Sequence, residues 1–141
     1  MSTKIRPELS RRNKWWIPKY RFLELKYYCL QYDSWQKEYQ ILSSDLGMIS
    51  PRYKHDRVLE SKYADKTADI AIRRIILENK IRMVQRLTCE ADYSLSEYLL
   101  KAVTRGMTYP ELSTKYDMPC GNNMFYDRWH KFFYLLDKEK N

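Results

Sequence analysis

The stretch 94–136 constrains the fold most, because signals that start and stop helices recur in it at short intervals. Ser94 and Glu97 have the spacing of a capping box, in which both side chains bind amides at the start of a helix. Thr108 and Glu111 repeat that spacing. Two helix starts so close together predict short helices joined by tight turns.

The helix ends in this stretch are also marked. Gly106 stands where the first helix should end, at the left-handed position that favours glycine. The second helix is predicted over 109–116 and a longer third helix from Asn122. This order is the helix-turn-helix motif, whose second helix can enter a DNA major groove. Ordinary helical bundles turn corners in the same way, so the motif alone favours the two interpretations about equally.

Composition places the motif in an all-α chain. A hydrophobic content of 44% with only three glycines in 141 residues favours a folded, mostly helical protein. We therefore expect a helical bundle with a long central helix and a C-terminal helix-turn-helix. No apolar run approaches the roughly 18 residues of a membrane span, so no membrane contact is expected. The three cysteines are far apart, which predicts a reducing compartment and no disulfide framework.

Four segments are predicted along the chain. Residues 1–17 form a basic N-terminal arm that is extended over 4–14, 18–46 a helical hairpin or bent helix, 47–63 a linker, and 64–141 the long helix with the helix-turn-helix. The first of these helices should bury an apolar stripe made of Tyr20, Leu23, Tyr27 and Leu30.

The long helix should run from about Asp65 or Thr67 to Ala91. One apolar stripe on it holds Ile70, Leu77, Ile81, Val84 and Ala91, and a neighbouring stripe holds Ile72, Ile76, Met83 and Leu87. Together they make an apolar face wide enough for two partners. The helix is either the core of a monomer or also packs on its copy in a homodimer, and the sequence leaves both open.

The chain is basic, with 26 Lys and Arg against 18 Asp and Glu and a net charge of +8. Such a charge attracts polyanions, chiefly nucleic acids or acidic membrane surfaces. The charge is uneven, because the first 14 residues hold five basic residues against one acidic residue. The stretch 87–121, before the last helix, holds three basic and five acidic residues. The arm is therefore more basic than the turn region.

No catalytic constellation is recognisable, so we expect no enzyme activity, cofactor or metal. His55 and His130 lack cysteine or carboxylate partners at metal-ligand spacing, and no glycine-rich phosphate loop is present. Cys120 lies just before a helix, where a thiol pKa can be lowered. No neighbouring residue supplies a base, so a small residue buried in the turn is favoured.

Four segments resemble small late-transcription regulators of the RinA and ArpU type, which phages and prophages of Gram-positive bacteria encode. They are RFLELKYYCLQY (21–32), AIRRIILENKIRMVQ (71–85), YLLKAVTRGMTYPEL (98–112) and MPCGNNMFYDRWHKFFYLL (118–136). The C-terminal part is similar to the helix-turn-helix of sigma factor region four. Pro110, Pro119 and a longer turn depart from that pattern. The resemblance implies DNA binding and gene control in the cytoplasm of a bacterial host.

The last helix carries an apolar stripe and polar residues beside it. Phe125, Trp129, Phe132 and Leu136 follow at steps of four, three and four, which is typical of a core face. The candidate DNA-binding residues are Asn122, Asn123, Tyr126, Arg128, His130 and Lys131 on this helix, and Arg11, Arg12 and Lys14 on the arm. Asparagine can bond adenine and arginine guanine at two points, while the other residues suit phosphates.

These features lead to three hypotheses. The first is a regulator of phage or prophage gene expression that binds double-stranded DNA. The second is a phage-encoded interaction protein that modulates a host nucleic-acid-handling complex, such as RNA polymerase or a guided nuclease. The third is a terminase-like packaging component, which requires a ring of subunits. The operator, the direction of control and the oligomeric state lie beyond the sequence.

Overall fold

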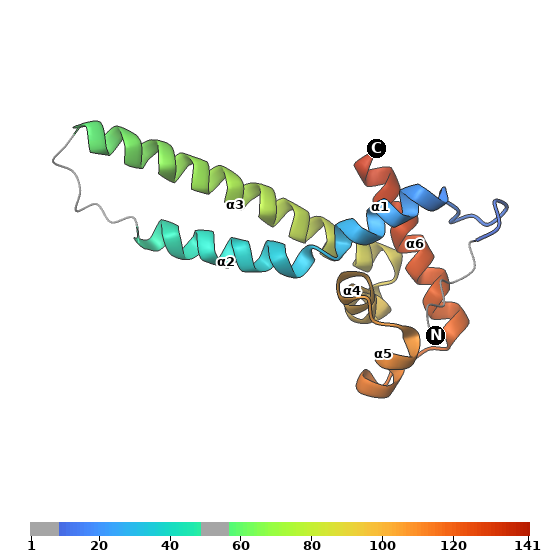
Figure 1. Cartoon of the computed structure of the whole chain (residues 1–141). Coiled ribbons are helices and arrows are strands. Elements are labelled where there is room, and N and C mark those ends of the chain that lie inside the picture. The colour runs from blue at the N-terminus through green and yellow to red at the C-terminus, as the bar shows by residue number, and fades with distance from the viewer. Residues whose placement is uncertain (1–8, 49–56) are drawn as a thin grey trace. The chain divides into compact units, whose positions relative to one another are not determined.

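The computed structural model describes residues 9–48 and 57–141, and the side chains of 9–45 and 65–141. Figure 1 shows that the regular structure in these ranges is entirely helical. The helices are α1 (Lys19–Cys29), α2 (Tyr32–Met48), α3 (Arg57–Ala91), the short 3-10 helix η2 (Tyr93–Leu95), α4 (Ser96–Arg105), α5 (Tyr109–Tyr116) and α6 (Asn122–Lys140). The all-α prediction with a long helix and a C-terminal helix-turn-helix is confirmed. Within the described ranges, no helix is long and apolar enough to cross a membrane.

The chain divides into two compact units. The first combines Met1–Gln31 with Val84–Asn141, and the second is Tyr32–Met83. The predicted linker at 47–63 therefore does not separate units, because α2 and most of α3 belong to the same one. Its length was also wrong, since α3 begins at Arg57 rather than near Asp65. The many charged residues of this stretch suggested a loop, but glutamate, lysine and arginine are good helix formers.

In the second unit, α2 and α3 run side by side in opposite directions (Figure 1). Arg73 donates to Glu38 (Nε–Oε1 2.9 Å), and Lys80 lies over the ring of Trp35 at 5.5 Å. Trp35 and Leu77 are buried, and Leu77 belongs to one of the two apolar stripes predicted on the long helix. Side-chain contacts thus join α2 to α3 at two places, Trp35 with Lys80 and Glu38 with Arg73.

The first unit has an apolar core drawn from every helix in it. Its largest fully buried side chains are Leu25, Val84, Leu87, Leu95, Leu99, Leu112, Phe125, Phe132, Phe133 and Leu136. Most of the predicted α6 stripe is therefore buried. Trp129 is only half-buried, whereas Phe133, which the prediction left out, is buried. The core face of α6 is thus centred slightly differently from the predicted stripe.

The predicted buried face of α1 was wrong. Tyr20, Tyr27 and Leu30 are exposed, with Tyr20 at 77%. The buried residues are Leu25 and Cys29, and Phe22 packs edge-to-face on Phe133 with ring centroids 5.0 Å apart. Tyrosine has an apolar ring and a polar tip, so it also suits a wet surface, and counting it as a core residue misplaced the stripe.

One of the two predicted capping boxes is present. Thr108 caps α5: the Glu111 N–H donates to its Oγ1, and the Thr108 N–H donates to Glu111 Oε1. Ser94 is not a cap, because Asp92 takes that role and accepts from the N–H groups of Ser94 and Leu95. An aspartate two residues earlier offers a stronger acceptor than a serine hydroxyl.

Candidate nucleic-acid interface

A network of aromatic contacts fixes α5, the turn and the start of α6. The Tyr109 hydroxyl donates to the carbonyl of Cys120 at 2.6 Å, and the Tyr109 N–H donates to the hydroxyl of Tyr126 at 3.1 Å. The Tyr109 and Phe125 rings lie 5.8 Å apart. Leu112 is fully buried. These contacts hold the two helices of the motif at a defined angle.

The turn between α5 and α6 leaves the first turn of α6 open. Asp117 ends α5 in the left-handed conformation at φ 57°, and Gly106 ends α4 likewise at φ 68°, as its glycine predicted. After the turn, Asn122, Asn123 and Met124 are all exposed. The side chains of the first turn of α6 therefore lie at the surface.

The N-terminal arm is folded rather than extended over its described residues. The backbone N–H of Asn13 donates to the carbonyl of Ser10, and that of Trp16 donates to the carbonyl of Asn13. The Asn13 side chain also accepts from the N–H of Trp15 at 2.8 Å. The prediction of an extended arm is thus wrong for residues 9–14, where asparagine and serine form turns. Residues 1–8 lie outside the described part of the chain.

Trp15 fastens the arm to the outward face of α6. Its indole N–H donates to Asp127 Oδ1 at 3.2 Å, and its ring meets Tyr134 edge-on with centroids 5.3 Å apart. Lys131 lies 5.6 Å from the centre of the same ring. Nothing in the sequence relates the arm to α6, which follows it by more than a hundred residues. This docking brings both groups of candidate residues to one surface.

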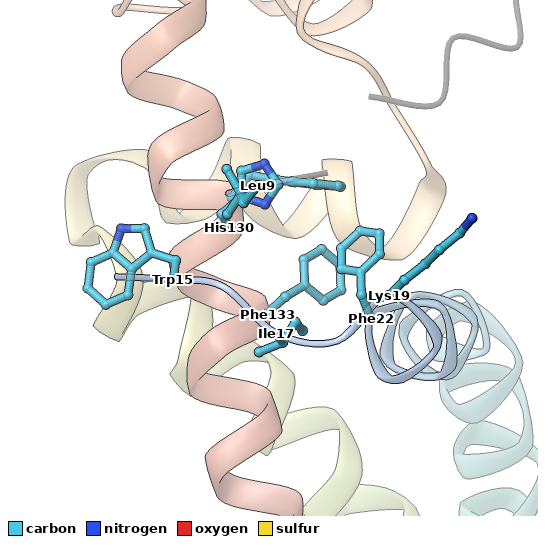
Figure 2. Close-up of a pocket in the computed structure, with 8 residues that line it drawn as sticks. Leu9, Trp15, Ile17, Lys19, Phe22, His130 and Phe133 are labelled. Carbon is cyan, nitrogen blue, oxygen red and sulfur yellow. The ribbon is translucent and has the colours of Figure 1, made fainter. Parts of the chain in front are cut away.

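Two small cavities lie where the arm meets α6. The first, about 70 Å³, is apolar, and Figure 2 shows the rings of Phe22 and Phe133 next to each other, with Ile17 nearby. The second, about 240 Å³, is more polar and is lined by Leu9, Asn13, Trp15, Asn123, Tyr126, Asp127 and His130. Several candidate DNA-binding residues therefore border one polar hollow on the surface of the first unit.

Arg128 is engaged in ion pairs within the protein. Its Nε donates to Asp92 Oδ2 at 3.1 Å, and its Nη1 donates to Asp127. Burial opposes ionisation of Asp92, but hydrogen bonds from Ser94, Arg128 and the Leu95 N–H outweigh it and lower the pKa of that carboxyl. In turn, the hydrogen bond with Asp92 raises the pKa of Arg128. Asp127 thus accepts hydrogen bonds from both Arg128 and the indole of Trp15.

Two other candidate residues on α6, Tyr126 and His130, also make contacts within the protein. The Tyr126 hydroxyl accepts from the α5 backbone, as above, and His130 packs edge-on against Trp129 with centroids 4.9 Å apart. Both residues, like Lys131, are half-buried. Their positions suit contacts with a nucleic-acid backbone at the edge of the surface better than insertion into a groove.

The basic arm residues are exposed and close to aromatic rings. Arg11 lies 5.7 Å from the centre of the Trp16 ring, and Lys14 lies 4.9 Å from that of Trp15. Arg12 is exposed as well. Cation–π contacts of this kind place a side chain while leaving its charge open to a partner.

Neither Cys29 nor Cys120 is an activated thiol. Burial raises the pKa of Cys29 to about 12 and also raises the pKa of Cys120, so the helix start at Asn122 does not activate that thiol. Cys89 is exposed. Among the described residues, no group of histidine, cysteine and carboxylate side chains could hold a metal ion.

Known proteins add nothing to this picture. No protein-family model, curated protein or solved structure matches the chain.

Proposed function

We propose that the chain is a DNA-binding regulator that reads double-stranded DNA with the first turn of α6 and holds it with the arm. The observation that carries the proposal is the docking of Trp15 on α6, which joins a basic segment to an exposed helix start. Helix-turn-helix proteins place the first residues of the second helix against base edges. The two features needed for reading and for holding DNA thus occur on one surface.

Asn122 and Asn123 are the proposed base-reading residues. Both are exposed at the start of α6, and an asparagine amide can make two hydrogen bonds to adenine in the major groove. The N–H groups of this first turn also suit a phosphate, because the start of a helix is the positive end of its dipole. Adenine-containing sites are therefore the expected targets.

The arm supplies the electrostatic part of binding in this proposal. Arg11, Arg12 and Lys14 are exposed cations on a segment fixed beside α6. Lys131, which lies over the ring of Trp15, and His130, which lines the same polar hollow as Trp15, add contacts to the sugar–phosphate backbone in this proposal. We leave Arg128 out of the interface, because it pairs with Asp92 and Asp127. If Arg128 moved to bind DNA, these two carboxylates would lose the cation that neutralises them.

Regulation of phage or prophage genes in a bacterial cytoplasm is the biological setting we propose. It follows the resemblance to RinA- and ArpU-type regulators and the sigma-like order of α4, α5 and α6. Host RNA polymerase is the protein partner that such a role would involve. The proposal includes no enzyme activity and no cofactor.

A second function is favoured by one observation. From Asp127 to Tyr134, the outward face of α6 is occupied by Trp15, which leaves little of it for a DNA groove. A protein that binds a host nucleic-acid-handling complex would need only the arm surface and the first turn. This interaction protein remains the alternative.

Selection from a randomised duplex library, followed by titration at several salt concentrations, tests the proposal. We expect enrichment of one motif and a linear fall of log affinity with log salt, because cations on the protein displace counterions from DNA. The folded protein's failure to bind any duplex at low salt would contradict the proposal. Binding without enrichment, together with capture of a stoichiometric host complex, would favour the interaction protein.

A further inference from the structure

Cations and aromatic rings are paired along residues 9–20, the segment that runs from the arm into the first turn of α1. Three contacts follow one another in it, measured from the cation to the ring centre: Arg11 to Trp16 at 5.7 Å, Lys14 to Trp15 at 4.9 Å and Lys19 to Tyr20 at 5.9 Å. Every aromatic ring of the segment thus has a cation within the roughly 6 Å of a cation–π contact.

The segment also has a strong positive charge that its surroundings do not cancel. Residues 9–20 include no acidic residue, and their four basic side chains are all exposed: Arg11, Arg12, Lys14 and Lys19. Glu24, one helical turn after Tyr20, pairs with Arg21 at 3.8 Å. Asp127, which accepts from the Trp15 indole, pairs with Arg128. The four exposed cations therefore suit a ligand with several negative charges.

The rings of this segment are open to a ligand to different degrees. Tyr20 is 77% exposed, although it stands in a helix that packs on the core. Trp16 is half-buried. Each of these rings offers a flat apolar face beside a cation. A nucleotide has the matching pair of groups, because its base is flat and its phosphate is negative.

Stacking on these rings selects unpaired nucleotides over other polyanions. In a duplex the faces of the bases are covered by neighbouring bases, whereas unpaired bases stack on aromatic side chains while cations follow the backbone. An acidic peptide would use the cations and leave the rings without a role. An anionic membrane takes up aromatic side chains that can insert, but Trp15 is held on α6 by Asp127 and Tyr134.

We propose that residues 9–20 bind a single-stranded oligonucleotide, with bases stacked on Tyr20 and Trp16 and phosphates held by the exposed cations. This activity goes beyond the duplex binding proposed above. Lys19 and Tyr20 have no part in the duplex surface, and the α6 asparagines have no part in the single-strand site. Failure of one proposal is therefore distinguishable from failure of the other.

Fluorescence anisotropy of the full chain with labelled oligo-dT and oligo-rU of about 12 nucleotides tests the proposal. The tighter ligand identifies DNA or RNA as the source of the strand. Tyr20→Ala should raise the dissociation constant at least about fivefold, because one stacked base loses its platform. Tyr20→Phe keeps the ring and should bind like the wild type. Tyr93→Ala is the matched control: Tyr93 is 82% exposed but lies on η2, so the constant should not change.

Lys19→Gln tests the electrostatic part of the site. It should flatten the salt dependence of oligonucleotide binding by about 0.7 units, the value for one phosphate contact on a single strand. Neither Lys19→Gln nor Tyr20→Ala should change the affinity for a duplex, and circular dichroism checks that both keep their helices. Absence of oligonucleotide binding at low salt, an unchanged constant in Tyr20→Ala, or an equal loss in Tyr93→Ala would overturn the proposal. So would binding to phosphatidylserine vesicles that depends on Tyr20 when oligonucleotide binding does not.

Discussion

The pairing of Asp92 with Arg128 should contribute measurably to stability. Asp92 caps η2 and accepts from the Arg128 guanidinium, and only 13% of its side chain is exposed. Loss of a cap costs about 1 kcal/mol. A charged hydrogen bond contributes about 1.5–3 kcal/mol, which we lower to about 1–2 kcal/mol because 32% of the Arg128 side chain is exposed. Asp92→Ala should therefore lower the free energy of unfolding by about 2–3 kcal/mol.

Asp92→Asn separates the cap from the charge. The amide oxygen can still accept from the η2 backbone, so this variant should lose only about 1–2 kcal/mol at neutral pH. The folded-state pKa of Asp92 is lowered, so its charge stabilises the fold above the unfolded pKa near 3.9. That contribution is lost as the pH falls towards the lower folded pKa. The difference between wild type and Asp92→Asn should thus shrink below about pH 4.

Urea unfolding at several pH values measures these differences. Glu97→Gln is a suitable control, because Glu97 pairs with Lys101 at 3.5 Å and is largely exposed. It should cost less than about 0.5 kcal/mol. Equal stability of Asp92→Asn and wild type at pH 7 would refute the reasoning. If Arg128→Ala kept full stability but lost DNA sequence preference, Arg128 would be a base-reading residue after all.

Further predictions concern the thiols, the α5 cap and the core. In the native protein Cys89 should react first with a thiol reagent at pH 8, and Cys29 only after unfolding, since its pKa is about 12; early modification of Cys29 would show that its site opens. Thr108→Ala should cost about 1 kcal/mol in urea unfolding, so unchanged stability would argue against the capping box. Phe132→Ala should cost about 3–5 kcal/mol, because this ring is fully buried; a loss below 1 kcal/mol would mean that the core repacks around it.

The sequence predicted most helices of the first unit because their signals are local. The Thr108 cap, Gly106 and the start of α6 at Asn122 depend only on neighbouring residues. Which face of a helix is buried depends on what it packs against. That is why the tyrosines of α1 were wrongly placed in the core, although the helix itself was expected.

The candidate site was only partly predictable for the same reason. The exposed Asn122 and Asn123 follow from their place at a helix start. The fixed position of the arm depends on the contact of Trp15 with Asp127, between residues 112 positions apart in sequence. Arg128 is held by Asp92, which lies 36 residues earlier in the sequence. No local motif predicts this contact, so Arg128 was wrongly expected to be open to DNA.

Paired titrations of two variants test the account's central claim most directly. Asn122→Ala/Asn123→Ala removes the proposed base-reading amides, and Arg11→Ala/Arg12→Ala removes two arm cations. On selected and scrambled duplexes, the first variant should lose about 1–3 kcal/mol per lost base contact on selected DNA only. The second should weaken both duplexes alike and flatten the salt slope by about one unit per lost phosphate contact. Unchanged binding in both variants would contradict the claim that the arm and α6 form one DNA-binding surface.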